Sequence, residues 1–184
     1  MEPTCRGAAL LLAAGAMLSP IEATALSAGE CAGLSIRVED VPEAVSTECG
    51  SRNIGGGGDQ GTGSREVVQV LGSTFVFVVS HASVGHRTYL VRLEVKDVIQ
   101  NHPVFETTDG WGDETKRGAF TVRRFDARLA GMQAACFGFT RFSGHVAGTT
   151  GYRHLISGYY CDFAGRSPTD ALIDDMMGRV GYDF

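Results

Sequence analysis

This sequence lacks the short motifs that mark common catalytic and metal sites. It contains neither a Gly-x-Ser-x-Gly nucleophile elbow nor a His-Glu-x-x-His zinc motif. No two cysteines stand as Cys-x-x-Cys, which argues against a structural zinc site. Any catalytic site would therefore have to be formed by residues that are far apart in the sequence and that the fold brings together. The sequence predicts no cofactor and no metal.

Lysine is nearly missing as well, since Lys96 and Lys116 are the only two. The formal net charge is −5. A surface that binds nucleic acid needs an excess of basic residues, so the composition argues against nucleic acid as a partner. Arginine supplies the remaining positive charge, and codon usage explains this preference more simply than an anion site does.

No apolar run is long enough to span a membrane. Residues 7–18 form the apolar run nearest the N-terminus, with Arg6 before it and the small-x-small sequence of residues 23–25 after it. This order is typical of a secretory signal peptide. We expect residues 1–25 to be a signal peptide cleaved after Ala25, and residues 26–184 to be one domain, periplasmic or secreted, with no transmembrane segment.

The cysteine count agrees with export. Four cysteines remain after the expected cleavage, and an even number in an exported protein favours disulfides. Three pairings are possible. Nearest-neighbour pairing, which joins Cys31 to Cys49 and Cys136 to Cys161, is the simplest.

Alternating and apolar stretches predict several strands. Residues 136–143 and 152–163 are rich in aromatic residues and are joined by a glycine-rich turn, which predicts an antiparallel hairpin closed by its two cysteines. Residues 88–96 alternate and predict a strand paired with 74–80. Further strands are expected over 34–38, 66–71 and 119–130, the last with a bulge at Arg123 and Arg124, and a helical turn is expected over 42–45.

The C-terminus predicts an amphipathic helix. Ser167 can cap it, and Leu172, Met176 and Val180 lie on its apolar stripe. The predicted fold class is α+β: an antiparallel sheet over about 66–163, with the C-terminal helix packed on one face and two disulfides.

Two predicted loops resemble known ligand-binding loops in composition, but neither has the full residue pattern of such a loop. Residues 50–64 are rich in glycine, yet no lysine follows, so we expect a flexible surface loop rather than a phosphate loop. Residues 109–114 are acidic but lack the register of a calcium loop. Trp111 lies in that acidic loop and remains a candidate ligand platform.

Arginines on neighbouring predicted strands give the one hypothesis for a ligand. Arg124, Arg141 and Arg153, together with Trp111, are the candidate ligand-binding residues for an anionic envelope ligand or a protein partner. Acidic residues interleave on the same strands, so internal pairing is the simpler explanation. The favoured function is a non-catalytic exported binding or accessory module of the cell envelope.

The alternative function is a small exported hydrolase that uses His145 or His154 as general base. A pocket with a histidine bonded to a carboxylate would favour the enzyme. His81 and His86 flank a predicted turn, and we expect them to be solvated.

Overall fold

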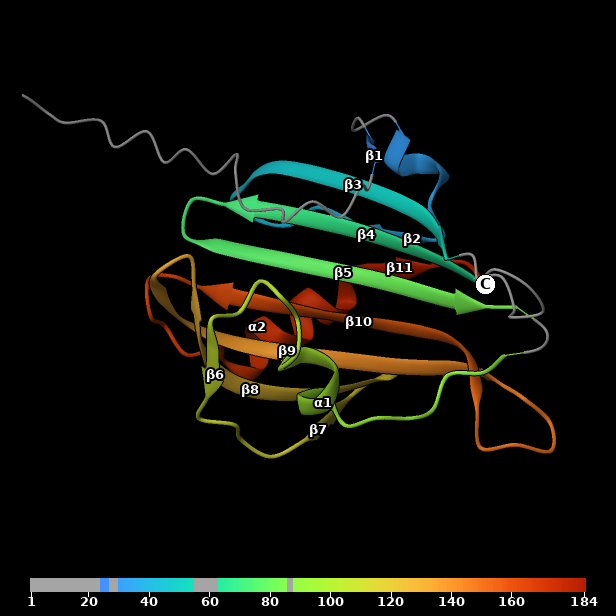
Figure 1. Ribbon diagram of the computed structural model, residues 1–184. Helices are drawn as coiled ribbons and strands as arrows, with labels where there is room; N and C mark the ends of the chain where they lie inside the picture. The colour runs from blue at the N-terminus through green and yellow to red at the C-terminus, as the bar shows by residue number, and fades with distance from the viewer. Residues whose placement is uncertain (1–23, 27–29, 55–62, 86–87) are drawn as a thin grey trace, which may run out of the picture.

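A computed structural model describes residues 24–26, 30–54, 63–85 and 88–184, and these are mainly antiparallel β-strands (Figure 1). The class is β rather than α+β, because the two α-helices have only five and nine residues. The described elements, in chain order, are β1 (Thr24–Leu26), the 3-10 helix η2 (Glu30–Gly33), β2 (Ile36–Val38), β3 (Ala44–Ile54), β4 (Gly63–Gly72), β5 (Phe75–Val84), α1 (Val95–Ile99), β6 (Thr107–Asp109), β7 (Thr115–Arg117), β8 (Phe120–Leu129), β9 (Met132–His145), β10 (Tyr152–Asp162), α2 (Asp170–Gly178) and β11 (Val180–Tyr182).

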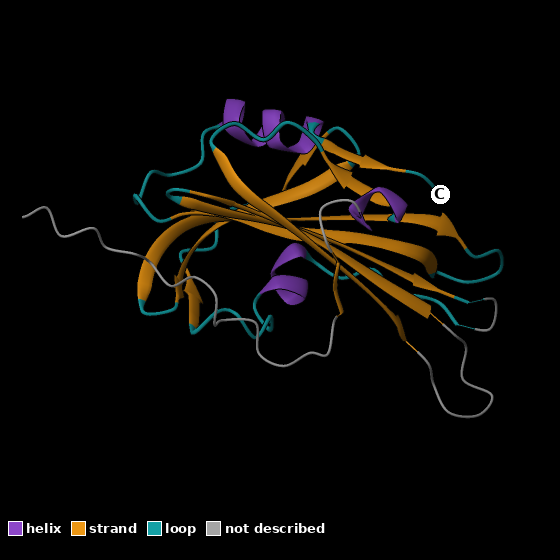
Figure 2. Cartoon of the chain, turned by 90° about the horizontal axis from the view of Figure 1, so that it is seen from above, coloured by secondary structure: helices purple, strands orange, loops and turns teal. Residues whose placement is uncertain are grey.

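One nine-stranded sheet contains most of the described strands. Its order is β1-β3-β4-β5-β10-β9-β8-β6, and β7 also pairs with β8. Strands β3 to β5 form one meander, strands β8 to β10 form a second, and the two join where β5 pairs with β10. β2 and β11 form a separate two-stranded sheet. Figure 2 shows that the large sheet is strongly twisted and has helices on both sides.

Both faces of the large sheet are apolar and covered. The face that carries Phe77, Phe137 and Phe139, here called the first face, shares a hydrophobic cluster with Ile36 of β2 and Ile173 of α2. The opposite, second face carries a cluster of its own. That cluster joins Val76, Val78 and Phe125 of the sheet to Val95 and Ile99 of α1. Side chains alternate between the two faces along each strand, so a strand covered on both sides has no polar phase.

The two predicted disulfides are confirmed. Cys31 in η2 is bonded to Cys49 in β3, with Cα atoms 5.6 Å apart. Cys136 in β9 is bonded to Cys161 in β10, with Cα atoms 4.1 Å apart. Cys136 and Cys161 stand directly opposite each other in the strand register, as the predicted hairpin requires.

The predicted strand over residues 88–96 is wrong. Only Leu90 forms a bridge there, to Tyr152, and the segment ends in α1. The neighbour of β5 is β10 instead. Tyr89, Val91 and Leu93 alternate as a strand would, but they are 49%, 58% and 49% exposed, so their apolar phase is not covered by the core.

Three smaller predictions also need correction. β8 pairs with β9 in one continuous register, so there is no bulge at Arg123 and Arg124. The buried apolar residues of β8 change from one face to the other at these arginines, from Phe120 and Val122 to Phe125 and Ala127, because both faces of the strand are covered. β3 begins at Ala44, so residues 42–45 are not a helical turn. α2 is capped by Thr169, whose side chain accepts a hydrogen bond from the backbone N–H of Leu172 at 3.2 Å, and not by Ser167.

Two of the predicted segments, the glycine-rich loop and the signal peptide, lie partly outside the described residues. Strands β3 and β4 reach residues 54 and 63, so they take up both ends of the expected loop at 50–64, while residues 55–62 lie outside the described residues. Residues 1–23 of the expected signal peptide also lie outside them. The expected cleavage point after Ala25 falls inside β1, which pairs with β3.

Candidate functional site

Polar residues replace apolar ones toward one end of the first face. Glu66 lies opposite His81 in the pairing of β4 with β5, and Ser143 lies opposite His154 in the pairing of β9 with β10. Directly opposed residues project from the same face of a sheet. The register therefore places a carboxylate, a hydroxyl and two imidazoles, which are far apart in sequence, on one polar patch.

A hydrogen-bonded chain links three of these groups. His81 Nδ1 lies 3.3 Å from Glu66 Oε2, and His81 Nε2 lies 3.2 Å from His154 Nδ1. Glu66 also accepts hydrogen bonds from the backbone N–H of Ser35 at 2.9 Å and from its hydroxyl at 3.2 Å. His81 is only 3% exposed, so the prediction that it is a solvated turn residue is wrong.

The carboxylate fixes the direction of the chain. A carboxylate accepts, so Nδ1–H of His81 donates to Glu66. In the neutral form of His81, its Nε2 then accepts from Nδ1–H of His154. Burial lowers the pKa of His154, and electrostatic interactions with His81 and Arg153 lower it further. These effects favour the neutral form of His154, whose Nε2 lies outside the chain.

The C-terminal residue covers the two imidazoles. The Phe184 ring stacks on His81 at 4.7 Å and on His154 at 4.4 Å between centroids. The tail is held by the pairing of β11 with β2, by an ion pair between Asp183 and Arg37, and by a hydrogen bond from the Asp183 N–H to the Ser35 carbonyl at 2.8 Å.

Two buried polar atoms next to this chain have no hydrogen-bond partner. They are Nη1 of Arg141 and Oγ of Ser143. The two residues are two apart on β9 and therefore lie on the same face. The Arg141 guanidinium carbon lies 3.8 Å from the centroid of the Tyr182 ring, and burial lowers the pKa of Arg141.

Other arginines predicted for the site engage protein groups instead. Arg124 donates to the carbonyl of Pro168 at 2.8 Å and to Asp170 at 2.5 Å. Arg153 donates to the carbonyls of Gly85 and Thr88.

Strand register keeps the predicted arginines apart. Arg124 and Arg141 project from the first face, four positions apart along β9, whereas Arg153 neighbours His154 and so projects from the opposite face. The structure therefore does not bring the three guanidinium groups together.

The remaining predicted residues also lie apart from one another. Trp111 stacks on Phe125 of the second face at 4.3 Å, and its buried Nε1 has no hydrogen-bond partner. Its ring lies within 5.8 Å of the Arg123 guanidinium. His145 is exposed at the end of β9 and meets the Tyr152 ring edge-on at 5.7 Å.

Sequence reasoning found Arg141 and His154 but missed Glu66 and His81. Alternation along β5 was the one feature of the sequence that could have revealed His81. Every second residue of the strand faces the same side, and His81 follows Phe75, Phe77 and Val79, which are core residues.

Comparison with protein-family models, with curated proteins and with solved structures finds no match to this chain. Within the described ranges, no cluster of three or more His, Cys, Asp or Glu side chains could hold a metal ion. The helices described here are all too short or too polar to cross a membrane.

Proposed function

We propose that this chain is an exported binding module of the cell envelope that holds a small oxyanion, a carboxylate or a phosphate, at Arg141 and Ser143. Two disulfides, the expected signal segment and the lack of a membrane-spanning helix among the described residues are compatible with export. The observation that carries the proposal is the buried Nη1 of Arg141, which has no hydrogen-bond partner.

The three arginines of the neighbouring strand β8 are all paired with carboxylates, unlike Arg141. Arg123 lies 3.3 Å from Glu94, Arg124 lies 2.5 Å from Asp170, and Arg128 lies 3.3 Å from Glu106. No described carboxylate forms an ion pair with Arg141. Burying part of a guanidinium without a partner is unfavourable, and an oxyanion oxygen would relieve that cost.

The neighbouring groups suit the same ligand. The Ser143 hydroxyl can donate to an oxyanion. The Tyr182 ring holds the Arg141 guanidinium by a cation–π contact, which limits its directions. Phe184 covers His154 beside Ser143, so binding requires Phe184 to move outward while Tyr182 stays on the Arg141 guanidinium.

One observation favours the hydrolase alternative. A chain from Glu66 through His81 to His154 lies beside the Ser143 hydroxyl, and such a chain could accept a proton from a nucleophile. Binding is favoured over catalysis because His154 reaches the carboxylate only through a second histidine. The Ser143 Oγ is also fully buried, and Phe184 covers both rings.

The test is an NMR titration of ¹⁵N-labelled protein with inorganic phosphate and, separately, with acetate. We expect saturable shifts of the amides around Arg141 and Phe184. Arg141→Gln should weaken binding about tenfold or more, as expected for a lost charge-assisted hydrogen bond. Arg128→Gln is the matched control, because Arg128 is exposed and paired with Glu106.

Three outcomes would contradict the binding proposal. The first is no saturable shift with either anion. The second is an Arg141→Gln variant that binds like the control. The third is turnover of p-nitrophenyl acetate that disappears in Ser143→Ala, which would replace binding by catalysis.

A further inference from the structure

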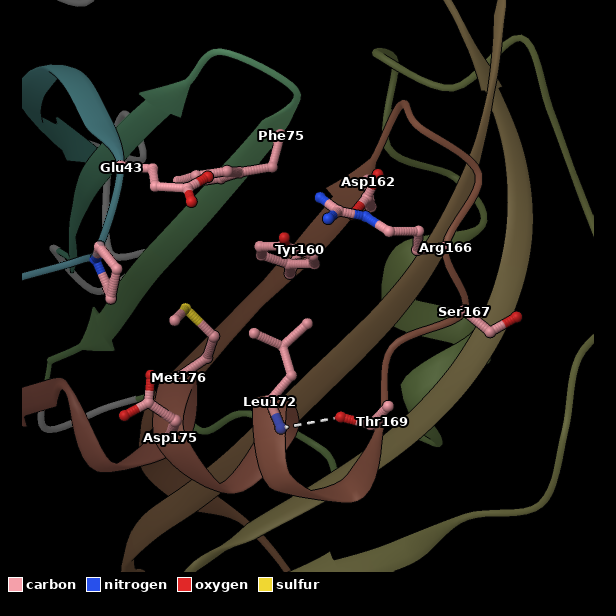
Figure 3. A pocket seen from close by; sticks show the side chains of 11 residues that line it. Glu43, Phe75, Tyr160, Asp162, Arg166, Ser167, Thr169, Leu172, Asp175 and Met176 are labelled. Atoms are coloured by element: carbon pink, nitrogen blue, oxygen red, sulfur yellow. Dashed lines mark hydrogen bonds and ion pairs between the residues drawn. The ribbon is translucent and has the colours of Figure 1, made fainter.

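A second site lies at the other end of the first face. There a pocket of about 320 Å³ opens between the turn before β3, the paired ends of β5 and β10, and α2 (Figure 3). Phe75 in this pocket and His81 in the polar patch are six residues apart on β5, or about 20 Å. The pocket is therefore separate from the Arg141 site, and its volume is in the range of small-molecule sites.

The floor of the pocket is aromatic. The rings of Phe75 and Tyr160 stack with centroids 5.4 Å apart, and the two residues are 6% and 5% exposed. Leu172 and Met176 of α2 add apolar lining. Tyr160 lines the pocket, and its hydroxyl is not one of the fully buried polar atoms that lack a partner among the described residues. Figure 3 shows this residue near the centre of the pocket.

The rim is acidic. Glu43, Asp162 and Asp175 line the pocket, against the single guanidinium of Arg166. Asp162 is 3.0 Å from Arg166, and Asp175 is 3.0 Å from Arg179 outside the lining, so both are neutralised. Glu43 has no ion pair within the described chain. One carboxylate therefore remains without a counter-charge above an aromatic floor.

We propose that this pocket binds a small organic cation, an amine carried on an apolar group. An ammonium group is attracted by carboxylates and by aromatic faces, while the apolar part packs on Leu172 and Met176. The Tyr160 hydroxyl accepts a hydrogen bond from the N–H of a primary amine. Burial and the charge of Asp162 raise the pKa of Tyr160 to about 12, so the hydroxyl stays uncharged.

The experiment compares three probes by isothermal titration and NMR shift mapping: 2-phenylethylammonium, its neutral analogue 2-phenylethanol, and choline. We expect the ammonium to bind about tenfold more tightly than the alcohol, from the cation–π and carboxylate attractions together. Glu43→Gln should weaken binding of both cations about threefold without affecting the alcohol.

Tyr160→Phe separates the role of the hydroxyl from that of the ring. It keeps the aromatic floor and should weaken binding of the primary ammonium about fivefold. Binding of choline, which has no N–H, should not change. Glu48→Gln is the matched control, because Glu48 is an exposed carboxylate on β3 outside the pocket lining.

Equal binding of the ammonium and the alcohol would overturn the proposal, as would failure of all three probes to bind. It would also be overturned if Glu43→Gln and Glu48→Gln had the same effect. Glucose is titrated in addition to the three probes, and its saturable binding in preference to the amines would assign the pocket to a neutral carbohydrate instead.

Discussion

Acidification should destabilise this protein through His102. The residue follows α1, and its ring meets Tyr159 and Phe105 edge-on at 5.5 and 6.1 Å. Its Nδ1 accepts a hydrogen bond from the Val104 N–H at 3.4 Å, so the neutral ring fits the fold. Burial, and secondarily the charge of Arg65, lower the pKa of His102 from 6.5 to about 4.

Acidification lowers the free energy of unfolding because the unfolded chain binds a proton at His102 before the folded protein does. As the pH falls below 6.5, the imidazole of the unfolded chain is protonated while the folded one stays neutral, so unfolding is favoured. The effect grows until the pH reaches the folded pKa, about 4. One pKa unit corresponds to about 1.4 kcal/mol, so the full difference would give about 3 kcal/mol. His102 is only partly buried, and screening by water lowers our expectation to about 2 kcal/mol.

Urea unfolding followed by circular dichroism at pH 7.5 and pH 4 measures this effect. Between these pH values the wild type should lose about 2 kcal/mol more free energy of unfolding than His102→Gln, which cannot titrate. Carboxylates titrate in both proteins and cancel in the difference. His145→Gln, at an exposed histidine, should follow the wild type. If the wild type and His102→Gln lose equal stability on acidification, the reasoning is refuted.

Two stability predictions concern the sheet. Replacing both Cys136 and Cys161 by alanine should lower the free energy of unfolding in urea by about 3 kcal/mol, since their bond closes a loop of 25 residues; a loss below about 1 kcal/mol would contradict this. Gly158→Ala should cost about 2 kcal/mol or more in thermal unfolding, because a Cβ there would stand 2.0 Å from the Val78 carbonyl oxygen and 2.5 Å from the Phe139 ring. Gly178→Ala is its control, since a Cβ there meets nothing within 4 Å, and equal melting temperatures of the two variants would count against the clash.

The closing hairpin was predictable because its signal is local. Residues 136–161 contain its disulfide, its glycine-rich turn and most of its two strands. The aromatic-rich runs and the spacing of the two cysteines are therefore enough to predict the hairpin. The partner of β5 was not predictable in the same way. The apolar phase of residues 88–96 resembles a strand, but β10 offers β5 a run of core residues on both faces and pairs with it instead.

The candidate site could be predicted only in part, because it also depends on the pairing of strands that are far apart in the sequence. His154 and Arg141 stood out as polar groups within a predicted hairpin. His81 lies on β5, whose pairing with β10 was not predicted, and Glu66 lies on β4, the next strand beyond β5. Nothing in their local sequence therefore placed them near His154. The pocket was equally hidden, because its walls come from the turn before β3, from β5, from β10 and from α2.

The pairing of β5 with β10, which joins the two meanders, also limits the order in which this chain can fold as it is synthesised. β5 is complete by Val84, but its partner β10 begins only at Tyr152. The N-terminal meander must therefore wait with an open, apolar strand edge, which is the kind of surface that pairs wrongly with other chains. The bond between Cys31 and Cys49 can form early, whereas the bond between Cys136 and Cys161 must await the β9–β10 hairpin, so the two disulfides belong to different stages of folding.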